Sequence, residues 1–216
     1  MKKILKRIWK IILIIICIIF VLLVVAVIYR LPVAIERSNT AEVVADIHNQ
    51  KLTMDDVVGE NLPSEPDIKL NNSTLAGIDT NNNGIRDDVE LAIFKLYPNS
   101  ARIRSGALQY AKAMQMHFRK DITNKDIFVA MIENEGRGDS CFWFALPSEN
   151  VKLAKTNEEL SKAFAIKENK NKEIYNLVFN TEMRKNKKDE NYKRYMTSLG
   201  GGNEPYCDID PLTLPN

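Results

Sequence analysis

Histidine and cysteine are scarce in this chain, whose 216 residues include two histidines and three cysteines. The sequence has no Walker loop, dinucleotide fingerprint, zinc quartet or G-x-S-x-G elbow, so the common signatures of nucleotide, cofactor and hydrolase chemistry are missing. No histidine follows Cys141, which excludes the cysteine–histidine pairing that papain-like proteases require. The sequence therefore predicts a protein that is not an enzyme.

A concentrated basic face is also missing outside the N-terminus. The formal net charge is +2, but the first 30 residues hold six cations and no acid: Lys2, Lys3, Lys6, Arg7, Lys10 and Arg30. Removing those six from 30 basic residues leaves 24 against 28 acidic ones, a net charge near −4 for the remainder. Phosphate backbones need clustered cations, so nucleic acid is excluded as a partner.

One long hydrophobic run stands out near the N-terminus. Every residue from Ile11 to Ile28 is apolar, and Trp9 and Tyr29 flank the run as interfacial anchors. At 1.5 Å per residue, the run and its edges span roughly 30 Å of hydrocarbon. It has no small-x-small cleavage site, so we expect an uncleaved membrane helix instead of a signal peptide. Five cations before the run and one after it predict a single-pass inner-membrane protein with a cytoplasmic N-terminus and a periplasmic C-terminal domain.

Four segments follow from composition. We expect residues 1–30 to form a basic tip and anchor, 31–74 a stalk and linker with short helices, 75–199 a helical extracytoplasmic domain, and 200–216 a C-terminal tail. Pro32 predicts the end of the membrane helix, and Thr40 the cap of a short new one. A further brief helix is expected after Thr53, with Gly59 at its end.

Helical periodicity dominates the expected domain, which predicts an all-α fold: one N-terminal transmembrane helix, then a small irregular helical domain. The longest apolar stripe follows Ser100 and comprises Ile103, Ala107, Ala111, Met114 and Phe118. Thr123 with Asp126 and Thr156 with Glu159 resemble capping boxes, the first opening a helix over 127–135 and the second a helix to about Lys167. The segment 141–146 is the one candidate strand, and it could equally be a buried helix.

A single motif carries specific chemistry. Residues 79–90 fit D-x-[DN]-x-[DN]-G-x5-E at every defined position. Calcium takes six to eight oxygen ligands, and this spacing supplies them from alternate positions around a sharp glycine turn. The expected ligands are the side chains of Asp79, Asn81, Asn83 and Glu90, the backbone carbonyl of Ile85, and Asp87 directly or through water.

These twelve residues resemble the EF-hand loop, specifically the isolated loops of extracytoplasmic bacterial proteins. The resemblance implies a bound Ca²⁺ of modest affinity, on the order of 10⁻⁴ to 10⁻³ M, acting as a structural clamp. Two departures are Arg86 in place of the usual hydrophobe and the poor incoming helix at 71–74. The alternative is an Asn-Gly turn that only caps a helix starting near Asp87.

A looser resemblance concerns residues 51–57 and 75–78, which look similar to small single-span envelope proteins of Gram-negative bacteria. Those proteins are functionally uncharacterised, so the resemblance implies location and the loop but no activity.

The cysteines outside the membrane segment form an even pair. With Cys17 inside the apolar run, Cys141 and Cys207 remain in a compartment that can be oxidising. We expect a disulfide between them, and the alternative is two unpaired thiols.

For function we expect a membrane-anchored module that binds another envelope protein. One concrete version is an immunity protein that neutralises a toxin delivered into the envelope. The alternatives are a structural envelope component and a cell-wall hydrolase using Glu133, Glu135 or His117.

Overall fold

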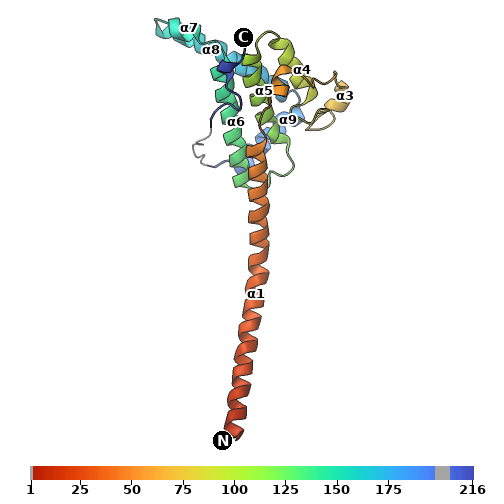
Figure 1. Ribbon diagram of the computed structural model, residues 1–216, viewed down its shortest axis with the longest axis vertical. Helices are drawn as coiled ribbons and strands as arrows, with labels where there is room; N and C mark the ends of the chain where they lie inside the picture. The colour runs from red at the N-terminus through yellow and green to blue at the C-terminus, as the bar shows by residue number, and fades with distance from the viewer. Residues whose placement is uncertain (1, 198–204) are drawn as a thin grey trace. The chain divides into compact units, whose positions relative to one another are not determined.

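The computed structural model describes residues 2–197 and 205–216, apart from the side chains of Glu149 and Asn150. Every regular element in this part of the chain is helical, as the periodicity predicts (Figure 1). The helices are α1 (Lys2–Asn49), α2 (Met54–Val58), α3 (Ile68–Asn71), α4 (Asp87–Leu96), α5 (Ala101–Gln115), η1 (Met116–Phe118), α6 (Lys125–Ala145), α7 (Glu149–Leu153), α8 (Asn157–Val178), α9 (Glu182–Tyr195) and η2 (Pro211–Thr213). The candidate strand at 141–146 is instead the end of α6, so the helical alternative is correct.

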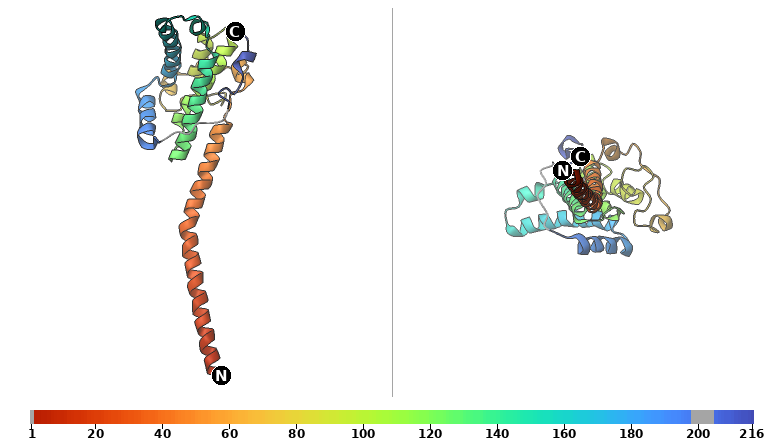
Figure 2. Two further views of the ribbon diagram at one scale, coloured as in Figure 1. Left: turned by 90° about the vertical axis from the view of Figure 1, so that its left-hand side faces the viewer. Right: turned by 90° about the horizontal axis from the view of Figure 1, so that it is seen from below.

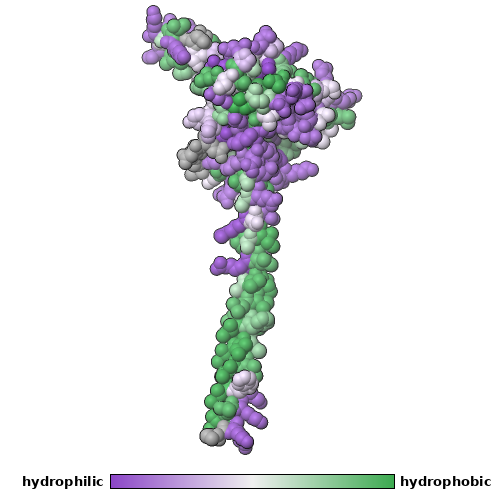
Figure 3. All heavy atoms as spheres, in the orientation of Figure 1, coloured by the Kyte–Doolittle hydropathy of each residue, from purple (hydrophilic) through white to green (hydrophobic). Residues whose placement is uncertain are grey.

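The chain divides into two units, Met1–Val43 and Val44–Asn216. Within the first, α1 is long enough and apolar enough to cross a membrane, and none of its most apolar 18-residue window is buried. A helix from a protein core would be covered by other elements. The hydrophobic side chains of this helix, green in Figure 3, are instead exposed. The first unit therefore provides a membrane anchor or a signal segment.

Two expected boundaries in this region are wrong, because α1 continues through both Pro32 and Thr40. Proline removes one N–H and crowds the carbonyl four residues earlier, but the helical hydrogen bonds on either side can persist. A threonine caps a helix only where the preceding backbone is not already helical.

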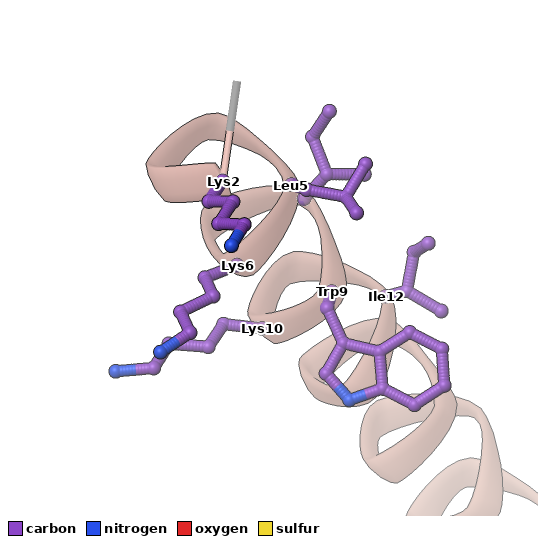
Figure 4. A pocket seen from close by; sticks show the side chains of 7 residues that line it. Lys2, Leu5, Lys6, Trp9, Lys10 and Ile12 are labelled. Atoms are coloured by element: carbon purple, nitrogen blue, oxygen red, sulfur yellow. The ribbon is translucent and has the colours of Figure 1, made fainter.

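The N-terminal tip of α1 is amphipathic. Lys2, Lys6 and Lys10 extend to one side of the helix, while Leu5, Trp9 and Ile12 lie on the other (Figure 4). Positions four residues apart share one helical face, which places the three cations together. Such a tip suits the boundary between a membrane and water, where tryptophan and lysine are enriched.

The core of the second unit is built on α5, which is buried continuously from Arg104 to Met114. It packs along α6, and the two helices lie side by side in Figure 2. Glycines permit this close approach: a Cβ at Gly106 would lie 2.7 Å from the Cα of Phe142, and one at Gly138 would lie 2.9 Å from the Cα of Tyr110. Close packing of the two backbones therefore depends on residues without side chains.

Most predicted helix starts are confirmed. Thr53 and Thr156 form complete capping boxes, and Ser100 caps α5. The Thr123 box is wrong, because Asn124 accepts the hydrogen bond from Ile127 N instead. The helix opened by Thr156 also runs past Lys167 to Val178.

The C-terminal segment belongs to the helical domain. The predicted disulfide between Cys141 and Cys207 is present, with a Cα–Cα distance of 4.9 Å. Beside it, Gln109 donates to the carbonyl of Tyr206 (2.7 Å) and accepts from the backbone N–H of Asp208 (2.9 Å). The expected tail boundary at residue 200 lies outside the described residues, but 205–216 pack against the domain. A disulfide-bonded domain fits an oxidising, extracytoplasmic compartment.

Candidate metal centre

The residues of the D-x-N-x-N-G motif form a tight loop around the Asp79 carboxylate. Asp79 Oδ2 accepts from the backbone N–H of Gly84 at 2.9 Å, and Oδ1 accepts from that of Asn83 at 3.2 Å. Gly84 adopts φ +83°, and Asn82 adopts φ +56°, a left-handed conformation that asparagine tolerates. Short polar residues and one glycine thus wrap the chain around a carboxylate.

Glu90 closes the loop from the first turn of α4. Its side chain faces the loop, where Oε2 accepts from Asn81 Nδ2 (3.1 Å) and Oε1 from Asn83 Nδ2 (3.0 Å). Glu90 is 1% exposed, and burial raises the pKa of its carboxyl to about 7. The two asparagine amides oppose this rise in pKa, while the charges of Asp56 and Asp79 add to it.

The pKa of Asp79 is raised as well, first by burial and further by the nearby charge of Asp87, against the hydrogen bonds from Gly84 and Asn83. Acidic groups that are buried close together disfavour each other's ionisation. A cation at their centre would reverse this effect.

Asp87, another expected ligand, is turned toward the start of the loop. Its Oδ1 accepts from the Thr80 backbone N–H at 2.9 Å, and its Oδ2 accepts from the Thr80 hydroxyl at 2.6 Å. Both oxygens of Asp87 are thus occupied by Thr80 in this structure. The side chain of Ile85 is fully buried in the core with Val89 and Ile93. This burial attaches the loop to the hydrophobic core.

The residues present fit a hard cation by their chemistry. Within the described parts of the chain, no three His, Cys, Asp or Glu side chains form a metal-type cluster. The amide oxygens of Asn81 and Asn83 accept the backbone N–H groups of Asn83 and Ile85, and their Nδ2 groups donate to Glu90. These bonds and those of Asp79 bring four of the six expected ligands together, and carboxylate and amide oxygens are the ligands that calcium takes.

Arg86 explains the departure at the eighth position of the loop. Its guanidinium is buried and donates to the carbonyls of Leu177 (2.8 Å) and Val178 (3.2 Å), while pairing with Asp88. The last carbonyls of a helix lack partners within it, so a cation there is favourable. Arg86 therefore joins the loop to the C-terminus of α8 by hydrogen bonds. The hydrophobic residue usual at this loop position would contribute by packing instead.

Arg184, which the sequence analysis did not single out, holds the chain before the loop. It is 0% exposed and donates to the carbonyls of Asn71, Thr74 and Leu75 and to the side chains of Asn72 and Asn180. Burial, reinforced by the charge of Arg86, lowers the pKa of Arg184 to about 10. The incoming α3 has only four residues, as the Asn-Asn-Ser-Thr sequence predicts, and Arg184 fixes the backbone that follows it.

Two of the residues considered for acid–base catalysis, His117 and Glu135, contact each other. His117 is 0% exposed, and its Nε2 lies 3.0 Å from Oε2 of Glu135. Asn191 donates to the His117 carbonyl, and the rings of Phe179 and Tyr192 cover the imidazole at 5.8 and 5.7 Å between centroids. The imidazole is thus held between α6, α9 and the end of α8, where it packs η1 against the domain.

A scan against protein-family models gave no match, and searches of the curated proteins and of the solved structures gave none either.

Proposed function

We propose that this protein is a single-pass inner-membrane protein whose periplasmic helical domain binds calcium through an EF-hand-like loop and acts as a protein-binding module. The observation that carries the proposal is the buried Glu90 carboxylate, which faces Asn81 and Asn83 beside Asp79. Calcium would offset the negative charge of these clustered acids. Its ligands would be Asp79, Asn81, Asn83, Glu90 and the carbonyl of Ile85, with Asp87 acting through water.

The location in the envelope is supported by three features. The apolar window of α1 is unburied, its lysine-rich tip precedes the window, and a disulfide lies in the second unit. Cations on the N-terminal side favour a cytoplasmic N-terminus, and the disulfide favours an oxidising compartment for the domain.

Binding to a protein partner is supported by an apolar surface on α7 and α8. Leu153 (72% exposed) and Ile166 (53% exposed) line a hollow of about 300 Å³ together with Ala154 and Ala163. Contiguous exposed apolar patches mark interaction sites, and these side chains would form the centre of such a patch. One concrete version of such a partner is a toxin delivered into the envelope, which this protein would neutralise.

The binding role is tested by photo-crosslinking in cells from Leu153 or Ile166, with exposed Asn186 on α9 as the control position. A discrete protein adduct from the first two positions and none from Asn186 would support the module. Crosslinks that are equally diffuse at all three positions would refute it. Recovery of a stoichiometric membrane complex would favour the structural alternative instead.

The immunity version has its own genetic test. It requires that deletion of the gene is tolerated only when a neighbouring toxin gene is also lost, and unconditional tolerance would exclude it.

A further inference from the structure

The end of α2 lies against the candidate calcium loop. Asn81 Nδ2 donates to the backbone carbonyl of Asn61 at 3.0 Å, across 20 residues of sequence. Asn61 follows α2 in the segment 51–62, which connects the end of α1 to the rest of the helical domain. A side chain of the loop thus holds the backbone of this connecting segment.

The two ends of the segment are held differently. At its start, Leu52 is buried, Lys112 donates to the carbonyl of Lys51 (2.8 Å) and Asp208 accepts from the N–H of Leu52 (3.0 Å). Its far end, residues 60–62, is exposed to solvent. Local backbone bonds also hold this end, from Glu60 N–H to Asp55 O (3.2 Å) and from Leu62 N–H to Gly59 O (3.4 Å). Exposed turns of this kind open easily, and the bond from Asn81 ties the turn to the loop.

Asparagine can make two kinds of contact at once, because its amide has one oxygen and two N–H donors. In the structure, Asn81 Nδ2 donates to both Asn61 O (3.0 Å) and Glu90 Oε2 (3.1 Å), one N–H to each. A cation bound by the amide oxygen would fix the orientation of the amide. The N–H that points to the Asn61 carbonyl would then be held in place.

We propose that calcium in the loop orders residues 59–62 through Asn81, whose amide oxygen binds the metal while its N–H holds the Asn61 carbonyl. This inference rests on the proposed calcium site and adds a consequence that the site alone does not require. An aspartate at position 81 would still be a ligand but would have no N–H to donate.

Asn83 provides a matched control. It lies two residues further along the same loop, and its Nδ2 donates to Glu90 and not to Asn61. Asn81→Asp and Asn83→Asp therefore add the same charge and keep the same type of ligand. They differ in the bond to the connecting segment.

The experiment is hydrogen–deuterium exchange of the full-length chain in detergent micelles, with millimolar CaCl₂ or with chelator, read at the backbone amides of residues 59–62. Calorimetric titration with CaCl₂ on the same samples measures binding independently. For the original chain and for Asn83→Asp, calcium should slow exchange by up to about five-fold, because the fixed amide would keep the existing bond to Asn61 closed for more of the time and one net hydrogen bond sets the upper limit. Asn81→Asp should bind calcium at least as tightly but show no slowing.

Each other result has a defined meaning. Equal slowing in all three proteins would overturn the role of Asn81, and calcium binding without slowing in the original chain would overturn the coupling while leaving the calcium site intact. Absence of binding in the titration of the original chain would overturn both this inference and the proposed site.

Discussion

Calcium should stabilise the helical domain, and Glu90→Gln should remove that effect. With a dissociation constant of about 10⁻⁴ to 10⁻³ M, free calcium at about 10 mM is ten- to a hundred-fold above it, which adds about 1.4 to 2.7 kcal/mol to the free energy of unfolding. For a domain of 150–250 residues, each kcal/mol raises the midpoint by about 2–4 °C, so the expected rise is about 3–11 °C. Thermal unfolding of the full-length chain in micelles, with calcium or chelator, measures it.

The behaviour of Glu90→Gln in chelator separates loss of the site from loss of the fold. The amide occupies almost the same volume and avoids the cost of burying a charge, but its N–H2 group cannot accept from Asn81 or Asn83 as the second carboxylate oxygen does. The two effects oppose each other, so its midpoint in chelator should lie close to that of the original chain. Glu158→Gln is the matched control, because Glu158 is an exposed carboxylate in the first turn of α8. It should keep the full calcium response.

Superimposed unfolding curves in calcium and chelator would refute the argument from the loop geometry. Residues 79–90 would then be an Asn-Gly turn that only starts α4. An equal rise with magnesium at the same concentration would show a general cation effect instead of a site built for calcium.

Three further perturbations test the packing. Cys141→Ser with Cys207→Ser opens a cross-link between residues 66 apart and should cost about 4 kcal/mol in the free energy of unfolding by the chain-entropy relation, measured with urea. Arg184→Met leaves buried carbonyls without donors and should cost at least about 3 kcal/mol in the same assay. Gly138→Ala should cost about 1–3 kcal/mol because its Cβ would meet the α5 backbone, whereas Gly136→Ala, with open space around it, should be neutral or stabilising by up to about 1 kcal/mol.

Each of these three predictions has a result that would contradict it. An unchanged urea midpoint for the double serine variant would mean that the cross-link adds no stability to the domain. Equal effects of the two glycine substitutions would contradict the close approach of α5 and α6. A harmless Arg184→Met would show that the backbone at 71–75 does not need its donors.

The sequence by itself determined the features that depend on neighbours along the chain. An unbroken apolar run, capping residues such as Thr53 and Thr156, and apolar positions at helical spacing are local patterns. The corresponding segments are helical, although α1 and α8 extend further than these patterns indicate. The disulfide could also be predicted from the sequence, since only Cys141 and Cys207 lie outside the apolar run. The calcium-loop hypothesis likewise comes from residue spacing alone.

Tertiary structure decided which of several locally acceptable states is occupied. The short apolar segment 141–146 suits a strand or a helix, and its burial against α5 in α6 selects the helix. Arg86, Arg184 and His117 look like surface residues in the sequence, yet all three are buried because acceptors from distant parts of the chain surround them. Such partners lie some 20 to 110 residues away, so no pattern in a short window reports them. The bond from Asn81 to Asn61 is of the same kind, and it is visible only once the loop and the end of α2 have been brought together.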